Sequence, residues 1–267
     1  TKNTSGKFAT HEYSNTTAEI KSYFPQSPGK TGVIMKYNDQ ELSFWNNPKM
    51  RLADNGNILI EKTATQVPGI PSENILTYSG LYDGMNEEFV VLENGEGIEN
   101  NIIVNYLSPD LITNNKNAEL EFYQFIPLSP EWKVYRGTEV MSGDFSAESF
   151  LIKKQNEKEG FVLNPIIVYD NAIKTNEQAF GLLRAPEERL SEDQKALLDN
   201  NILKGKYKIH FVSGGIEIYY VVSYGWFAET NRKFPVTIDP TFIIGTATLN
   251  LAGLWDGYYV DTLKQNI

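Results

Sequence analysis

Strict alternation of apolar and polar side chains is clearest in the last quarter of the chain. Residues 206–212 read Lys-Tyr-Lys-Ile-His-Phe-Val, and the same period of two returns over residues 216–222. A period of two places successive side chains on opposite faces of a strand. Because Ser213-Gly214-Gly215 separates the two runs, the pattern predicts a hairpin with one face in the core and one in water.

Shorter apolar runs separated by turn residues recur along the chain from residue 32 onward. They occupy residues 33–37, 42–45, 58–60, 88–92 and 119–126. Asp54-Asn55-Gly56-Asn57 stands before one of these runs, and Asn and Gly tolerate the positive φ of a tight hairpin turn. Aromatic residues make up 12% of the chain, which favours strands over helices. The sequence therefore predicts an all-β protein, an antiparallel β-sandwich formed as one unit or as two packed β lobes.

A helical pattern stands out in one place, residues 191–204. Ser191 is followed three residues later by Gln194, which is the spacing of a capping box. Residues 196–198 (Ala-Leu-Leu) supply an apolar face, and Gly205 is suited to end the helix. We therefore expect one α-helix, inserted in a connection between two strands of the sandwich.

Composition divides the chain into three segments. Residues 1–31 are polar and end in Pro25-Gln26-Ser27-Pro28-Gly29, which indicates an N-terminal arm or linker. Residues 32–241 contain the predicted sandwich. Near its end, Pro235 and Pro240 bracket a four-residue strand, which we expect at an edge or terminus of a sheet because proline cannot donate to the ladder. Residues 242–267 again resemble β-structure and are expected to form an outgoing β segment or the start of a following module. The polar start, with no signal-peptide pattern, suggests a fragment of a longer protein.

Charge and cysteine content narrow the range of partners. The chain carries 24 basic and 34 acidic residues, a net charge of −10, which disfavours nucleic acid and anionic membrane surfaces. No run of about 18 apolar residues occurs, so we expect no membrane insertion. Cysteine is absent, which excludes disulfides and thiolate chemistry and leaves cytosolic and bacterial surface proteins open.

The two histidines do not suggest a catalytic centre. His11 lies in the predicted arm, and His210 lies on the outer face of a predicted strand. Activation of a nucleophile needs a histidine beside a Ser or Cys. Zinc needs a set of Cys and His ligands that two separate histidines and no cysteine do not supply. We expect both histidines to be ordinary surface residues.

Paired carboxylates are the strongest enzymatic feature. Glu119 and Glu121 share one face of a predicted strand, and Glu87 and Glu88 are adjacent. A glycosidase uses two carboxyl groups, one of them with a raised pKa. Pairs on an amphipathic strand usually belong to its solvated face. We therefore predict no catalytic residue and no enzymatic activity.

Oxygen-bearing side chains near turns are the candidates for a cation. Asp54, Asn55 and Asn57 surround a glycine, and Asp256 and Asp261 lie near the end of the chain. Ca²⁺ prefers such oxygen ligands, but turn chemistry alone explains the first group. We expect no cofactor, with Ca²⁺ as the one weak candidate.

The four tryptophans allow two interpretations. They are Trp45, Trp132, Trp226 and Trp255. Each lies within or beside an apolar run, where packing in the core is the commoner role of an indole ring. A sugar-stacking platform is the alternative.

Two stretches resemble a known group of proteins. Residues 75–104, from Ile-Leu-Thr-Tyr to Asn-Ile-Ile-Val, and residues 232–241, Arg-Lys-Phe-Pro-Val-Thr-Ile-Asp-Pro-Thr, are similar to the N-terminal β-rich regions of bacterial Rhs, wall-associated and related large secreted or cell-surface proteins. Glu99-Asn100 stands where that family has Lys-Glu. The resemblance implies an extracellular β-sandwich that precedes other modules, and it carries no catalytic residues.

These observations favour a non-enzymatic binding or structural module of a large bacterial surface or secreted protein, such as an adhesin or appendage component. Its expected partners are neighbouring modules, other surface proteins or glycans. A carbohydrate-active enzyme or its sugar-binding accessory domain is one alternative. A protective, prodomain-like cap of a secreted toxin is another.

Overall fold

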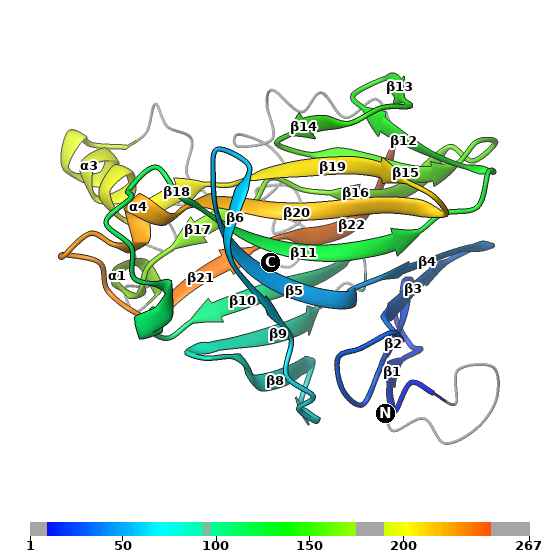
Figure 1. The fold of residues 1–267 in the computed structure, drawn as a ribbon. Coiled ribbons are helices and arrows are strands. Elements are labelled where there is room, and N and C mark those ends of the chain that lie inside the picture. Colours follow the sequence, from blue (N-terminus) through cyan, green and yellow to red (C-terminus); the bar gives the residue numbers. More distant parts are fainter. Residues whose placement is uncertain (1–9, 93–94, 96, 175–189, 247–267) are drawn as a thin grey trace.

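The strands of this chain are arranged as a two-layer antiparallel sandwich (Figure 1). The structure is a computed structural model that describes residues 10–92, 95, 97–174 and 190–246. Within these residues the strands form three antiparallel sheets, one of which supplies the first layer and two the second. The predicted all-β sandwich is confirmed.

The first layer is the large sheet. It contains β7 (Gly69–Ser72), β8 (Ile75–Tyr82), β9 (Met85–Val91), β10 (Gly97–Val104), β12 (Trp132–Arg136), β13 (Glu139–Met141), β15 (Phe150–Lys154), β16 (Glu159–Leu163), β17 (Ile167–Tyr169), β18 (Ile202–Lys204), β21 (Val236–Asp239) and β22 (Thr241–Thr246). Strand β10 pairs with β9 on one side and with both β21 and β22 on the other. Since only Pro240 separates β21 from β22, these two strands continue one line across the sheet.

The second layer consists of a six-stranded and a four-stranded sheet. The six-stranded sheet contains β5 (Asn46–Asp54), β6 (Asn57–Thr63), β11 (Glu119–Pro127), β14 (Phe145–Ala147), β19 (Lys206–Val212) and β20 (Gly215–Ser223). The four-stranded sheet contains β1 (Tyr13–Asn15), β2 (Lys21–Phe24), β3 (Val33–Tyr37) and β4 (Gln40–Phe44). Only Trp45, with a φ of 60°, separates β4 from β5, so the chain turns there from one sheet into the other.

The predicted hairpin at residues 206–222 is confirmed as β19 and β20. Tyr207 faces Tyr220 and Ile209 faces Ile218 across the ladder. All four side chains are at most 2% exposed and belong to the core. Phe211 packs against the same core but is only partly buried, because it lies near the end of the strand.

Aromatic rings connect the two layers. The ring of Phe150 in the large sheet lies 5.2 Å from that of Tyr207 in the six-stranded sheet. Phe44 of the four-stranded sheet lies 4.3 Å from Phe242 of the large sheet. One hydrophobic cluster includes side chains from all three sheets, and each large apolar side chain buried there contributes about 1.5 to 3 kcal/mol.

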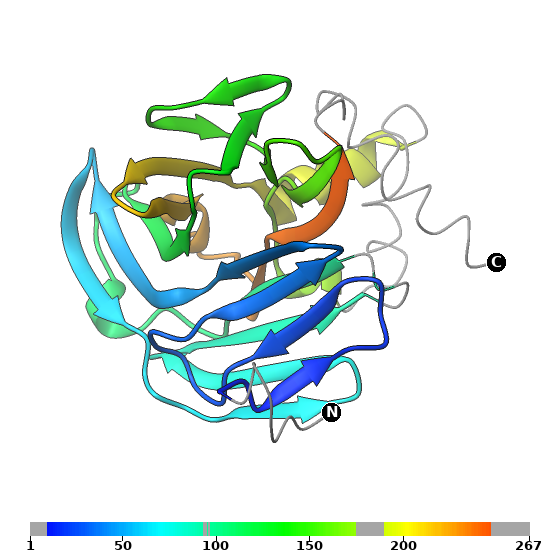
Figure 2. The ribbon, with the colours of Figure 1, turned by 90° about the vertical axis from the view of Figure 1, so that its right-hand side faces the viewer.

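The N-terminal segment belongs to the sandwich. The sequence predicts an arm or linker for residues 1–31, whereas the described part of this segment forms β1 and β2 beside the strands β7 to β9 (Figure 2). Ile20 and Phe24 are 2% and 4% exposed, and Phe24 lies 5.6 Å from Phe89. Their packing partners lie far away in sequence, so the local composition resembles that of a linker.

The segment after residue 241, predicted as an outgoing β segment or the start of a following module, begins as a β-strand. Its first residues continue β22, which pairs with β10 and β16 inside the large sheet. Residues 242–246 therefore complete the sandwich. Residues 247–267 lie outside the described residues.

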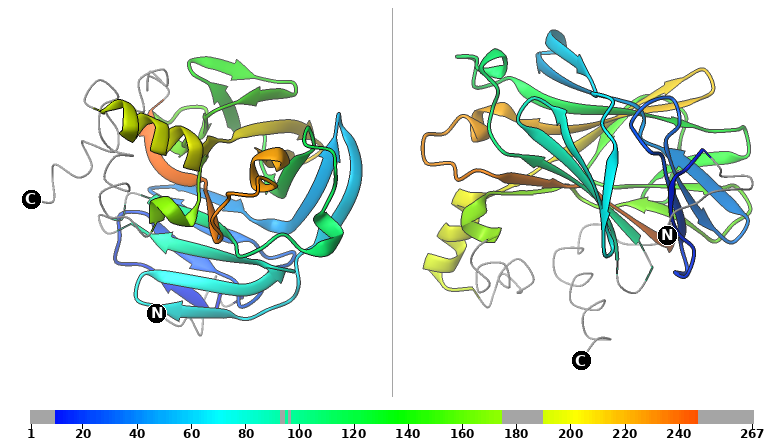
Figure 3. Two further views of the ribbon diagram at one scale, coloured as in Figure 1. Left: turned by 90° about the vertical axis from the view of Figure 1, so that its left-hand side faces the viewer. Right: turned by 90° about the horizontal axis from the view of Figure 1, so that it is seen from below.

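Helices occupy little of the described chain and gather at one end of the sandwich (Figures 1 and 3). They are the 3₁₀ turn η1 (Pro109–Leu111), α1 (Asn171–Lys174), α3 (Glu192–Asn201) and α4 (Tyr224–Phe227). The capping box of α3 is confirmed, since Ser191 Oγ accepts from the Gln194 amide at 3.3 Å and the Gln194 side chain accepts from the Ser191 amide at 2.8 Å. The helix ends at Asn201, three residues earlier than expected, because β18 begins at Ile202. None of its residues is fully buried.

None of the helices in the described segments is both long and apolar enough to cross a bilayer.

Strand β21 lies in the interior of the large sheet, between β10 and β17. The two prolines that bracket it, Pro235 and Pro240, led us to expect an edge or terminal strand, and this prediction is wrong. Both prolines stand outside the four paired residues, so neither has to donate a hydrogen bond to the ladder.

Arg232, the first residue of the motif at 232–241, connects three elements. Its guanidinium lies 3.3 Å from the ring centroid of Trp226 on α4, and Nη1 lies 3.3 Å from the Asp170 carboxylate. Nη1 also donates to the Asn200 carbonyl at 2.8 Å, at the end of α3. The side chains of Arg232 and Asp170 are at most 1% exposed, so this end of the motif has a structural role.

Candidate functional site

Glu119 and Glu121 lie on the outer face of the six-stranded sheet, as their spacing on β11 predicts. Both accept from one lysine, because Nζ of Lys208 lies 2.5 Å from Glu119 and 2.7 Å from Glu121. Lys206 adds a contact of 2.9 Å to Glu119. The side chain of Glu121 is only 2% exposed, so the expectation of a solvated pair is wrong for this residue.

Arg51 on β5 completes this cluster from the other side. Its Nε lies 2.5 Å from Glu121, and its guanidinium lies 4.0 Å from the ring centroid of Tyr219. Glu121 is therefore held between two cations and beneath side chains of the neighbouring strands, which explains its burial.

The electrostatics of this cluster are those of an ion-pair network. Burial alone would raise the pKa of Glu119, but hydrogen bonds from Lys208 and Lys206 outweigh it and lower that pKa. Burial would lower the pKa of Lys208, and its bonds to Glu119 and Glu121 raise it instead. The general acid of a glycosidase needs a raised carboxyl pKa, so Glu119 is unsuited to this role.

Glu87 and Glu88 do not form a pair, because adjacent residues of β9 point to opposite faces of the large sheet. Glu87 faces the core and is 4% exposed, whereas Glu88 is half-buried on the other face. Asn100 donates to Glu87 at 2.6 Å. Burial raises the pKa of Glu87 to about 7, although the hydrogen bonds to its carboxylate act in the opposite direction.

The histidines lie in different environments. His11 is 3% exposed, and its Nε2 lies 3.0 Å from the Gly32 carbonyl oxygen, so the prediction of a surface residue is wrong. Burial lowers the pKa of His11 despite this hydrogen bond. His210 lies on the outer face of β19, where Nδ1 contacts Asp144 at 2.7 Å, as the alternation predicts.

The turn from Asp54 to Asn57 joins β5 to β6. Asn55 and Gly56 have φ values of 49° and 81°, as a two-residue hairpin turn requires. The amide of Asn55 donates to the Asp54 carboxylate at 3.0 Å. Within the described residues no three acidic or histidine side chains cluster as metal ligands would. Turn chemistry thus accounts for the residues from Asp54 to Asn57, and their role as Ca²⁺ ligands stays a prediction. The other two candidates, Asp256 and Asp261, lie outside the described residues.

The three described tryptophans pack against other side chains. Trp45 is 1% exposed and lies 5.1 Å from Phe89. Trp132 contacts Phe161, and Trp226 contacts Phe227, at ring distances of 6.2 and 5.4 Å. Trp45 lies between β4 and β5, Trp132 lies on β12 and Trp226 lies on α4, and all three pack with the core. Trp255 lies outside the described residues.

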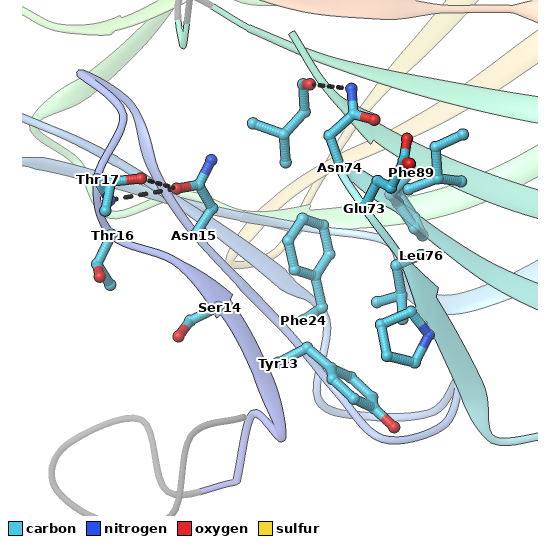
Figure 4. A pocket seen from close by; sticks show the side chains of 13 residues that line it. Tyr13, Ser14, Asn15, Thr16, Thr17, Phe24, Glu73, Asn74, Leu76 and Phe89 are labelled. Carbon is cyan, nitrogen blue, oxygen red and sulfur yellow. Dashed lines mark hydrogen bonds between the residues drawn. The ribbon is translucent and has the colours of Figure 1, made fainter. Parts of the chain in front are cut away.

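A surface pocket of about 300 Å³ opens where the edge strand β1 meets the β7–β8 hairpin (Figure 4). Its lining comes from four separate parts of the chain. The lining residues are Tyr13, Ser14, Asn15, Thr16, Thr17, Phe24, Pro71, Glu73, Asn74, Ile75, Leu76, Phe89 and Val91. The pocket thus exists only because two sheets place their edges side by side.

The pocket combines an apolar base with a polar rim. Phe24, Leu76, Phe89 and Val91 are at most 9% exposed and belong to the core. The rim carries hydroxyl and amide groups from residues 14–17 and a carboxylate and an amide from the turn at residues 73–74. This arrangement can hold a ligand that has both an apolar face and polar edges.

No lining residue is among the site residues that the sequence nominated. The polar part of the rim lies in a segment interpreted as a linker, and the apolar part resembles ordinary core positions. Hydroxyl and amide residues clustered over 14–17 were the only local signal, and they are equally typical of a loop.

No family model matches this chain, and no curated protein is significantly similar to it. The resemblance to regions of Rhs and wall-associated proteins therefore stays a prediction.

Proposed function

We propose that this chain is a non-enzymatic binding module of a large extracellular or cell-surface bacterial protein, and that it binds through the pocket between β1 and the β7–β8 hairpin. The pocket carries this proposal, because an apolar base with a few convergent polar groups is what ligand sites share. Its volume of about 300 Å³ suits a small ligand or one residue of a polymer.

Hydrogen bonds connect the elements that bound the pocket. The Tyr13 hydroxyl donates to the Gly69 carbonyl at 2.9 Å, which connects β1 to β7. The Gly69 amide donates to the Gln26 carbonyl at 2.8 Å, which connects β7 to the segment after β2. A site that is already ordered loses less conformational entropy when a ligand binds.

The carboxylates support binding over catalysis. Glu119 and Glu121 are neutralised by three cationic side chains, and Glu87 is enclosed in the core. Purified protein should release no reducing ends from polysaccharides. Release that is abolished by Glu119→Gln or Glu121→Gln would contradict the non-enzymatic proposal.

Binding can be tested without knowing the natural ligand. Four probes are titrated separately into methyl-labelled protein: a methyl hexopyranoside, glucuronate, N-acetylalanine methylamide and inorganic phosphate. We expect at least one probe to shift the methyl resonances of Leu76 and Val91, which lie in the pocket. Asn15→Trp, which fills the pocket with an indole ring, should abolish that shift.

Asn115→Trp is the matched control. The Asn115 side chain accepts from the backbone amide two residues later, as Asn15 does, but lies outside the pocket. It should leave binding unchanged. The binding proposal fails if none of the four probes shifts the pocket methyls, or if Asn15→Trp binds as well as the unmodified protein.

The sequence of the full open reading frame tests the extracellular context, because the neighbouring modules identify the class of protein. Repeat or adhesin modules after residue 267 would support the proposal, whereas a catalytic domain would make the chain an accessory module of an enzyme. A toxin domain would favour the protective cap.

A further inference from the structure

Asn15 presents a donor to the pocket. Its Oδ1 accepts from the Thr17 amide at 3.2 Å and from the Thr17 hydroxyl at 3.1 Å. These bonds fix the side chain so that the amide nitrogen lies on the side away from Thr17 (Figure 4). An amide nitrogen can donate but not accept.

The opposite rim presents acceptors. The Asn74 amide nitrogen donates to the Val91 carbonyl at 2.9 Å, so the amide oxygen of Asn74 is left to accept. Glu73 adds a carboxylate next to it. Both residues form the two-residue turn between β7 and β8, since Ser72 pairs with Ile75. A turn this short holds the two acceptors close together.

Flat apolar surfaces form the base of the pocket. The ring of Phe24 lies between Asn15 and Asn74 (Figure 4), and it packs against the ring of Phe89 at 5.6 Å. The Tyr13 ring lies below Phe24 in that view, and its hydroxyl bond to Gly69 at 2.9 Å positions it. A ligand that fits must therefore offer an apolar face to aromatic side chains and hydrogen-bonding groups around its edge.

The charge of the pocket and of the whole chain further limits the class of ligand. Among the described lining residues, Glu73 alone carries a formal charge, and the whole chain carries −10. Both disfavour an anionic ligand. A donor on one side and acceptors on the other suit hydroxyl groups, which donate and accept at once.

We infer that the pocket binds one neutral pyranose residue of a glycan. The apolar face of the sugar ring packs on the aromatic base formed by Phe24 and Tyr13, one hydroxyl accepts from Asn15, and hydroxyls on the other edge donate to Asn74 and Glu73. This inference rests on the proposed binding function and names the class of ligand for the same pocket.

The test compares ligand classes in the same methyl-NMR titration. Methyl glycosides of glucose, galactose, mannose and N-acetylglucosamine are compared with glucuronate and with N-acetylalanine methylamide. We expect at least one neutral glycoside to shift Leu76 and Val91, and glucuronate to bind about fivefold more weakly because its carboxylate meets Glu73.

Variants test each assigned contact. Asn15→Leu keeps the size of the side chain but removes its donor, and should weaken glycoside binding about fivefold, while Asn115→Leu should not. Tyr13→Leu should weaken binding more than Tyr13→Phe, which retains the ring face.

The outcomes separate the two proposals. If glucuronate or the peptide mimic shifts the pocket methyls and no neutral glycoside does, the sugar inference is wrong and the binding function stands. If no probe shifts them, both are wrong. Equal glycoside binding by Asn15→Leu, Asn15→Trp and unmodified protein would also overturn the inference.

Discussion

Glu87 is a carboxyl group inside a hydrophobic core. It accepts from Asn100, whose oxygen lies 3.5 Å from the Tyr220 hydroxyl of the opposite layer. Gln124 in turn donates to Tyr220, so a chain of polar side chains crosses the sandwich beside a cavity of about 10 Å³. A cavity of this size holds about one water molecule. Buried polar groups need such partners, since each unsatisfied one costs about 1 to 3 kcal/mol.

The raised pKa of Glu87 makes stability depend on pH. The folded-state pKa is about 7 and the ordinary value is 4.5, so the folded protein holds this proton more tightly than the unfolded chain. The associated stability is fully present below pH 4.5 and is lost as the pH rises to about 7, by about 3 kcal/mol in total. Glu87→Gln should therefore raise the free energy of unfolding at pH 8 and change it little at pH 4.

Urea unfolding at both pH values measures this difference. Glu88→Gln, on the other face of the same strand, serves as the control and should retain the pH dependence of the unmodified protein. If Glu87→Gln shows no gain at pH 8, then Glu87 does not hold its proton in the folded state.

At the scale of elements, ion pairs join three strands of the six-stranded sheet, β19, β11 and β5. Lys208 on β19 reaches over β20 to Glu119 and Glu121 on β11, and Arg51 on β5 meets Glu121 from the other side. Exposed pairs contribute little, but Glu121 is nearly inaccessible to water. Removing one of its partners leaves a buried charge poorly compensated.

Lys208→Ala should therefore destabilise the protein by about 1 to 3 kcal/mol. The alternating pattern alone would predict about 0.5 kcal/mol or less, as for other surface positions. Lys206→Ala is the matched control on the same face, because Lys206 is half exposed and contacts only Glu119 among the described ion pairs. Chemical denaturation of both variants measures the free energy of unfolding and decides between these two magnitudes. Equally small losses of stability in both variants would show that Lys208 is an ordinary surface residue.

At the scale of the whole molecule, the two sheets of the second layer depend on the large sheet for their core. Phe24 and Phe44 of the four-stranded sheet both contact Phe89 of the large sheet, at 5.6 and 6.1 Å. Gln40 also donates to the Glu159 carbonyl at 2.8 Å, which connects β4 to β16. The N-terminal strands and the remaining strands should therefore unfold together.

Phe24→Ala should lower the stability of the entire protein by about 3 to 5 kcal/mol, because it leaves a cavity in the shared core. Lys21→Ala, on the exposed side of the same strand, should change it by about 0.5 kcal/mol or less. Tryptophan fluorescence during urea unfolding provides the measurement. A linker at residues 1–31 would instead make both substitutions harmless.

The sequence by itself determined the elements that depend on near neighbours. The period of two predicts β19 and β20, the glycine turn predicts the β5–β6 hairpin, and the Ser191 box predicts the start of α3. In each case the deciding interactions lie within a few residues along the chain, so the local pattern contains the necessary information.

Only the tertiary structure decided which strands became neighbours, and with them the candidate site. Proline spacing suggested an edge position for β21, yet β10 and β17 flank it. The alternating pattern predicted a solvated Glu121, but Arg51 and Lys208 contact this side chain and it is buried. The composition of residues 1–31 predicted a linker, but Phe24 packs against Phe89 in the core. These contacts join residues that are tens of positions apart. The pocket between β1 and the β7–β8 hairpin exists for the same reason, since the packing of the shared core places two sheet edges side by side and no local pattern encodes that arrangement.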